Sequence, residues 1–212
     1  MYKHPLINRE KMTPQEALDI LVEGNHRFVN GITEQKNHRD LADITKNEQR
    51  PFVGVLSCSD SRAPTEFIFD QALGDIFSVR LAGNIASNKA IGSLEFACKH
   101  LGSKLVVVLG HTSCGAVKAA CDNFEEGHIG EITSLIKPAV NLETSVKDLR
   151  NSTNVDFLAK VCKLNVDTQI KRMLSESKIL SELLEQKKIG LVGGIYDLNT
   201  AQVNFIADDM VF

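Results

Sequence analysis

Four short runs of consecutive apolar residues most constrain what this chain can fold into. They cover residues 52–57, 76–81, 105–110 and 189–195. Between the second and third runs, residues 89–102 carry apolar side chains at helical spacing. Strands that are apolar throughout are typical of parallel sheets covered by helices on both faces. The pattern therefore predicts an α/β fold with a mostly parallel central β-sheet flanked by helices.

A helical N-terminal arm is predicted before the first strand. Residues 13–31 carry a capping box, in which Thr13 is the expected N-cap and Glu16 the residue three positions later. Gly31 is suited to end the helix. A polar stretch, residues 33–50, then connects the arm to the first strand.

The second half of the chain is predicted to be mostly helical. Residues 113–188 have a helical pattern, with breaks expected near Pro138 and at the polar run 151–154. Residues 203–207 are predicted to form a short extra strand at an edge of the sheet. We expect one domain over residues 1–212, in which residues 1–50 form the arm and connection and residues 51–212 the α/β core.

The composition argues against nucleic-acid and membrane partners. The chain has 24 Lys and Arg against 27 Asp and Glu, a net charge of −3, and no long block of either sign. No window holds the roughly 18 consecutive apolar residues of a membrane-spanning helix. Residues 1–12 lack the apolar stretch of a signal peptide. We expect a cytoplasmic protein, although a signal peptide removed before this sequence begins would leave no trace in it.

The five cysteines do not form a disulfide pattern, because their number is odd and they are widely spread. Cys98 and Cys162 lie among apolar residues on expected helices, and we predict that both are small core residues. A Cys-x-x-Cys redox motif, a Walker phosphate loop and a Gly-x-Gly-x-x-Gly dinucleotide motif are all missing from the sequence.

Reactive side chains follow two of the predicted strands. In LSCSDSRAP, residues 56–64, Cys58, Asp60 and Arg62 alternate directly after an apolar run, and His111 and Cys114 follow another. Functional groups of an open α/β sheet collect at the carboxyl ends of its strands. If the two strands are parallel neighbours, the two thiols and the imidazole form a Cys₂His set that suits zinc. Asp60 is then available as a fourth ligand or as a base beside the metal.

These motifs resemble those of the β-class carbonic anhydrases. The Cys-x-Asp-x-Arg motif is followed, 53 positions after Cys58, by His-x-x-Cys at His111 and Cys114. The similarity extends from TPQEAL in the arm to GGIYDLNT near the end of the chain, and so covers most of it. The resemblance implies that Cys58, His111 and Cys114 hold one Zn²⁺ per subunit. It also implies reversible hydration of CO₂ to bicarbonate and a proton, by attack of zinc-bound hydroxide.

The same resemblance implies roles for further residues. Arg62 is expected to hold Asp60 off the metal in the active state, whereas Asp60 itself binds zinc in the closed state. The residues matching substrate-binding positions are Gln49, Phe77, Ala82 and Phe96, and Gln49 is expected to act across a subunit interface. The protein is therefore expected to be a homodimer at minimum, with a homotetramer as the larger option.

At one position the sequence differs from a set of three residues that part of the family uses to bind bicarbonate. Members that bind bicarbonate at a separate inhibitory site use Trp, Arg and Tyr. Arg80 and Tyr196 match two of these positions, but Val55 stands where the Trp would be. We therefore expect no such inhibitory site here, and structural roles for Arg80 and Tyr196.

Two alternative functions remain open at this point. Relatives on the same fold hydrolyse CS₂ or COS at the same metal, through a different access tunnel. A non-catalytic zinc-stabilised binding module is the other alternative, and it would need the fourth metal position to be filled permanently. A CO₂ hydration assay separates these functions.

Overall fold

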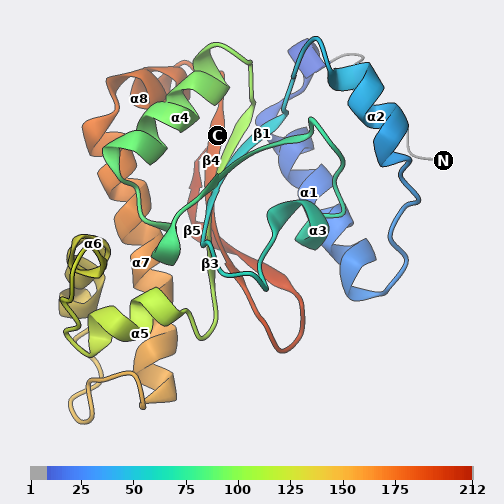
Figure 1. The fold of residues 1–212 in the computed structure, drawn as a ribbon. Helices are drawn as coiled ribbons and strands as arrows, with labels where there is room; N and C mark the ends of the chain where they lie inside the picture. Colours follow the sequence, from blue (N-terminus) through green and yellow to red (C-terminus); the bar gives the residue numbers. More distant parts are fainter. Residues whose placement is uncertain (1–8, 212) are drawn as a thin grey trace.

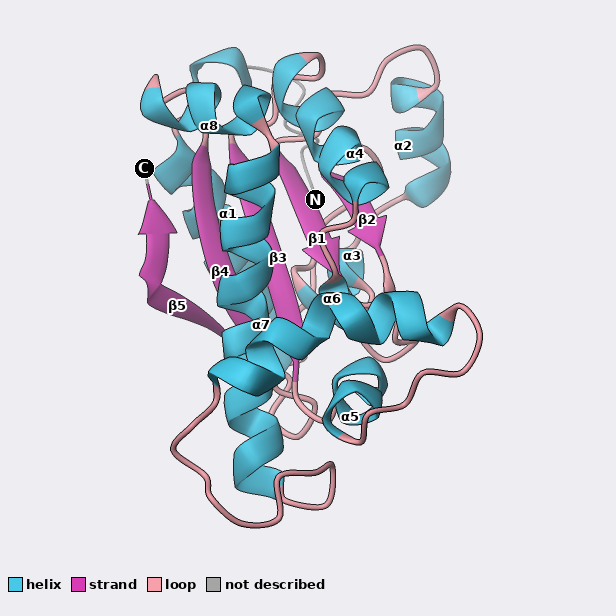
Figure 2. Cartoon of the chain, turned by 90° about the vertical axis from the view of Figure 1, so that its left-hand side faces the viewer, coloured by secondary structure: helices cyan, strands magenta, loops and turns pink. Residues whose placement is uncertain are grey.

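A five-stranded sheet with strand order β2-β1-β3-β4-β5 forms the centre of the molecule. The computed structural model describes residues 9–211, so residues 1–8 and 212 of the expected domain lie outside the described part. Strands β1 (Val53–Ser57), β2 (Ile76–Arg80), β3 (Leu105–His111) and β4 (Gly190–Tyr196) are parallel, and β5 (Val203–Val211) runs antiparallel to β4 at one edge. Figure 2 shows β5 and β2 at opposite edges. The predicted α/β fold with a mostly parallel sheet is confirmed.

Helices cover both faces of this sheet. The helical elements before β3 are η1 (Arg9–Lys11), α1 (Pro14–Val29), α2 (His38–Thr45), α3 (Thr65–Ile68), η2 (Ala82–Asn84) and α4 (Asn88–Lys99). Those after β3 are α5 (Gly115–Cys121), α6 (Ile129–Leu142), α7 (Val155–Glu176) and α8 (Lys178–Glu185). Helices α4, α7 and α8 pack on one face and α1 and α3 on the other (Figure 1). Within residues 9–211, no helix is both long and apolar enough to cross a membrane.

The strand register places the carboxyl ends of the central strands level with one another. Val53 at the start of β1 pairs with Ile76 of β2 and with Leu105 of β3. Every residue of β1 and β3 is buried. The continuous apolar runs in the sequence are thus explained by burial of both faces of the sheet. The side chains that follow β1 and β3 emerge at the same edge.

The N-terminal arm has the predicted start and is tied to the core by buried ion pairs. Thr13 caps α1, and Glu16 completes the capping box. Arg9 pairs with Asp75, whose side chain is fully buried, directly before β2. The carboxylate of Asp70, after α3, accepts hydrogen bonds from the side chains of Arg27 and Lys36.

Three local predictions differ from the structure. The polar connection of residues 33–50 contains α2, which Asn37 caps and which is short, mostly polar and buries only Leu41. The predicted break near Pro138 is wrong, because α6 continues through this residue and its buried side chains pack in the core. Strand β5 reaches Val211, beyond the predicted residues 203–207.

Two helix glycines allow a test of how closely the arm packs. A Cβ atom at Gly24 in α1 would lie 1.8 Å from the backbone oxygen of Phe69, whereas one at exposed Gly92 in α4 would meet nothing within 4 Å. We expect Gly24→Ala to lower the free energy of unfolding by about 1–3 kcal/mol or more, because α1 must move off the core. Gly92→Ala is the matched control, expected to raise it by up to about 1 kcal/mol through helix propensity. Denaturant unfolding measures both, and a neutral Gly24→Ala would contradict the close contact.

Candidate metal centre

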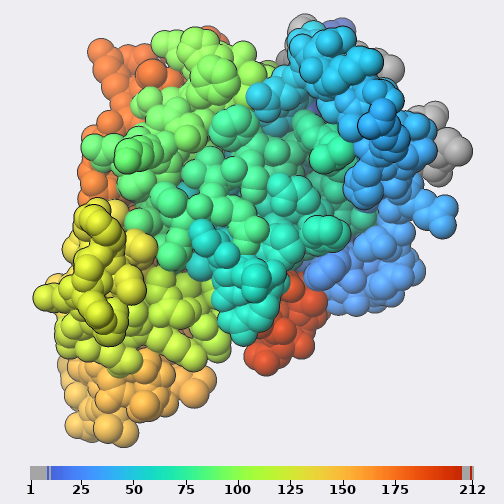
Figure 3. All heavy atoms as spheres, viewed as in Figure 1, coloured from blue at the N-terminus to red at the C-terminus, as the bar shows by residue number. Residues whose placement is uncertain are grey.

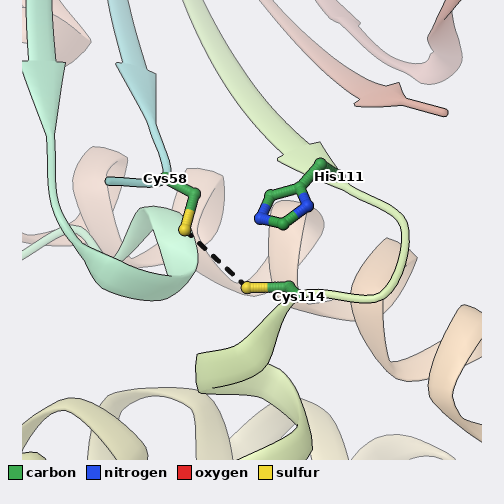
Figure 4. A group of neighbouring side chains, drawn as sticks. All are labelled: Cys58, His111 and Cys114. Carbon is green, nitrogen blue, oxygen red and sulfur yellow. Dashed lines mark hydrogen bonds between the residues drawn. The ribbon is translucent and has the colours of Figure 1, made fainter. Parts of the chain in front are cut away.

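Three elements bring Cys58, His111 and Cys114 together at the carboxyl edge of the sheet. Cys58 directly follows β1, His111 is the last residue of β3, and Cys114 is the N-cap of α5. All three side chains are buried, and their possible ligand atoms lie within 4.8 Å of one another. Figure 4 shows the imidazole and the two sulfurs facing one shared space. The structure thus brings these three residues together, as the sequence predicts.

The spacing and the hydrogen bonds of this cluster fit a tetrahedral metal ion. The two sulfurs lie 3.8 Å apart, and two thiolates bound tetrahedrally at about 2.3 Å from zinc would be separated by about 3.8 Å. Nδ1 of His111 lies 2.9 Å from the backbone oxygen of Thr112. Because a carbonyl oxygen only accepts, Nδ1 carries the hydrogen and Nε2 keeps its lone pair. Nε2 is buried and has no hydrogen-bond partner among the described residues.

The two thiols share one negative charge when no metal is present. The hydrogen bond from Cys114 lowers the pKa of Cys58 to about 4, with help from the N–H of Gly83. The same interaction with Cys58, together with burial, raises the pKa of Cys114. At neutral pH the metal-free pair is therefore one thiolate and one thiol, and a cation that replaces the shared proton restores two thiolate ligands.

A carboxylate held by an arginine lies beside this cluster. Arg62 donates to Asp60 from Nε to Oδ1 at 2.9 Å and from Nη2 to Oδ2 at 2.7 Å, and its backbone N–H donates to Oδ1. These bonds hold the pKa of Asp60 well below its usual range. Oδ2 of Asp60 lies 3.8 Å from Nε2 of His111. An ionised carboxylate therefore stands next to the nitrogen expected to bind metal.

Two groups that hold the Cys58 loop were not assigned to the site from the sequence. Arg80, at the end of β2, donates from Nε to the backbone oxygen of Cys58 at 3.0 Å and from Nη2 to that of Asp60 at 2.6 Å. The N–H of Gly83 donates to Sγ of Cys58 at 3.3 Å. These two hydrogen bonds from its guanidinium let Arg80 hold the backbone on both sides of Ser59 in place. Only the register of β1 with β2 reveals this contact.

The predicted substrate residues divide between two places. Ala82 begins η2, one residue before Gly83, and so lies near the cluster. The rings of Phe77 and Phe96 lie 6.4 Å apart, but Phe77 is level with Gly54, about 13 Å of strand before Cys58. Gln49 precedes β1 and lines a cavity of about 570 Å³ at the amino edge of the sheet. The fold of one chain therefore does not bring Gln49, Phe77 and Phe96 to its own metal-binding cluster.

Known proteins are similar to this chain in sequence and in fold. Residues 53–203 match the family model described as carbonic anhydrase. The chain is 33% identical over 192 residues to the carbonic anhydrase of Mycolicibacterium smegmatis, a match that covers 90% of this chain and 92% of the relative. The crystal structure of a β-carbonic anhydrase of Aspergillus fumigatus has a TM-score of 0.71 at 26% identity, over 80% of this chain and 82% of that one. Tetrameric β-carbonic anhydrases of Sordaria macrospora share the fold at 22% identity, with a TM-score of 0.68 over 90% of this chain and 96% of theirs.

The ionisation of the thiol pair can be measured after metal is removed with a chelator. We expect the thiolate ultraviolet absorbance of Cys58 to persist from alkaline pH down to about pH 4, because the folded pKa lies far below the usual value of about 8.5. At about pH 7, Cys58→Ser should therefore lose this absorbance. Cys162→Ser is the matched control and should not lose it, since burial raises the pKa of Cys162 to about 12. Equal absorbance of wild type and Cys58→Ser would contradict the shared charge.

Proposed function

This chain belongs to the β-class carbonic anhydrase family, and we propose that it hydrates CO₂ reversibly with one Zn²⁺ per subunit, held by Cys58, His111 and Cys114. The reaction joins CO₂ and water to give bicarbonate and a proton. The observation that carries the proposal is the buried cluster of these three residues. Its two sulfurs lie 3.8 Å apart, and Nε2 of His111 beside them has no hydrogen-bond partner among the described residues.

The chemistry of the three side chains favours zinc over harder cations. Two sulfurs and one imidazole nitrogen suit zinc, whereas magnesium and calcium prefer oxygen ligands. When bound, Zn²⁺ supplies the Lewis acidity that makes hydroxide available from water, and because two anionic thiolates weaken this effect we expect activity to rise above about pH 7. Thr112 supports the arrangement, because its backbone oxygen keeps the hydrogen of His111 on Nδ1.

Asp60 and Arg62 would orient the attacking oxygen. An ionised Asp60 accepts hydrogen bonds but donates none. Its Oδ2, beside Nε2 of His111, can thus take a hydrogen bond from the nucleophile and turn its lone pair toward the carbon of CO₂. The forked pair with Arg62 keeps Asp60 ionised and would hold its carboxylate off the metal itself. Lysine cannot form this two-pronged pair.

We propose that a second copy of the chain completes the substrate pocket. Gln49, Phe77 and Phe96 lie away from the cluster of their own chain, and Phe96 is 47% exposed. Helix α3, next to β2, also exposes Phe67. Figure 3 shows the green segments around β2 at the centre of one face, between α2 and α6. A homodimer formed through this face would cover its apolar side chains.

A homotetramer is the larger assembly compatible with this proposal, as in the tetrameric enzymes of Sordaria macrospora. Residence in the cytoplasm stays a prediction.

Stopped-flow CO₂ hydration tests the catalytic proposal. The zinc-loaded wild type should turn over rapidly, with a rate that rises from neutral to alkaline pH. Arg62→Lys should still bind zinc but lose at least about tenfold in kcat/KM, because Asp60 loses its forked partner. Cys58→Ser is the control for metal dependence and should lose both zinc and activity.

Two outcomes would contradict this proposal. A wild type that binds one zinc per subunit and hydrates no CO₂ would direct the search to CS₂ and COS hydrolysis or to a binding role. An Arg62→Lys variant with wild-type kcat/KM would remove the orienting role from the Asp60 and Arg62 pair.

Mixing two inactive variants tests whether the site is shared between subunits. If Gln49 acts on the metal site of a second copy, a mixed dimer of Cys58→Ser and Gln49→Leu contains one site with both changes and one with neither. Co-refolding the two variants should therefore restore activity, up to one intact site per mixed dimer. Each variant refolded alone is the control. Absence of restored activity in dimers verified as mixed would mean that Gln49 does not act across the interface.

A further inference from the structure

Two fully buried amide side chains on α7 take no part in the catalytic proposal above. Asn165 and Gln169 are both 0% exposed, and they lie one helical turn apart on the same face of the helix. Burying an amide is unfavourable unless its donors and acceptors find partners. The partners of these two side chains therefore indicate why polar groups occupy core positions.

The two amides form a directed hydrogen-bond chain toward the segment that follows β2. The backbone N–H of Ala86 donates to Oε1 of Gln169 at 2.9 Å. Nε2 of Gln169 donates to the backbone oxygen of Leu135 and to Oδ1 of Asn165, each at 2.9 Å. Nδ2 of Asn165 then donates to the backbone oxygen of Gly83 at 2.9 Å. A backbone N–H can only donate and a backbone carbonyl can only accept, so these partners fix which amide atom of each side chain is oxygen and which is nitrogen.

The segment at the end of this chain has an unusual backbone and contacts a metal ligand. Gly83 and Asn84 both have positive φ, at 70° and 45°. The N–H of Gly83 donates to Sγ of Cys58, while its carbonyl accepts from Asn165. The positive φ favours glycine at position 83, and a Cβ atom there would come 2.5 Å from Cδ1 of Ile136 and force that side chain to shift. The peptide groups of this turn are thus held between α7 and the sulfur of Cys58.

We propose that Asn165 and Gln169 are positioning residues for the metal centre, which fix the Ala82–Asn84 turn so that the N–H of Gly83 points at the Cys58 thiolate. This inference rests on the proposed function, because it assumes that Cys58 binds zinc. The amides touch neither the metal nor the substrate, and they act only through the turn. Arg172 extends the same support, since its Nε donates to the backbone oxygen of Ala86 at 3.0 Å.

The proposal assigns two consequences to this support. A hydrogen bond to a thiolate is charge-assisted, so it stabilises the electron pairs on sulfur and fixes the direction from which sulfur binds a metal. The turn also carries Ala82, which matches a substrate-binding position. Loss of the amide chain should therefore alter the metal–sulfur bond as well as the pocket. A purely structural role in the core would alter folding stability alone.

The experiment uses Co²⁺ in place of zinc as a spectroscopic probe of the whole 212-residue chain. Asn165→Leu keeps the branched outline of the side chain but removes its donor and acceptor. We expect this variant to lose at least about tenfold in zinc affinity, measured by competition with a chelator. We also expect its thiolate-to-cobalt charge-transfer band to move to lower energy, because the sulfur electrons are less stabilised. Met173→Ala is the matched control, since Met173 is also fully buried on α7 but has no hydrogen-bond donor.

The control separates positioning from packing. Met173→Ala should lower thermal stability through a core cavity while leaving zinc affinity and the cobalt band as in the wild type. Gln169→Met leaves Asn165 in place and should give smaller changes of zinc affinity and of the cobalt band, in the same direction as Asn165→Leu. This variant replaces Asn165→Leu in the test if Asn165→Leu does not fold. Wild-type affinity and band position in the amide variants, or equal shifts in Met173→Ala, would overturn the proposal. If the wild type itself bound no zinc or hydrated no CO₂, the proposed function would fail instead.

Discussion

The level, parallel register of β1 and β3 is the constraint on which the rest of the site depends. Ser57 pairs with Leu109, so Cys58 and His111 leave the sheet within about one residue of each other. A shift of one residue would turn every side chain of a strand to the opposite face. The helices on both faces prevent that shift, because each strand buries apolar side chains against both layers. The same packing that gives the sheet its stability thus sets the separation of the ligands.

Charge at this edge is controlled by paired interactions. Cys58 and Cys114 hold one proton between them, and the ionised Asp60 is joined to Arg62. Backbone groups provide the remaining support, since the N–H of Gly83 reaches the sulfur of Cys58 and the carbonyl of Thr112 reaches His111. A buried site of this kind has little water to compensate a misplaced group. Small movements of the surrounding turns therefore matter more here than at the surface.

The residues expected to act in the site lie at opposite ends of the same sheet. The carboxyl edge holds the cysteines, the histidine and the Asp60 and Arg62 pair, whereas Gln49 lies at the amino edge and Phe77 in the amino-terminal half of β2. The length of β1 keeps these groups apart within one chain. A pocket that uses both sets thus needs two copies of the chain. In the proposed dimer, the exposed apolar face around β2 is the surface where the two copies would meet.

The sequence by itself determined the strands, the capped helix α1 and the three candidate metal ligands, because each depends on residues close together in the chain. Apolar runs and a capping box are local signals, and side chains that follow two parallel strands meet at one edge when the strands are neighbours. Only the tertiary structure decided the contacts of Arg80, Gly83, Asn165 and Gln169, since each joins elements distant in sequence. It also decided that α6 continues through Pro138 and that Gln49 lies far from its own cluster. Packing energy and strand length govern these outcomes, and neither leaves a pattern in a short stretch of sequence.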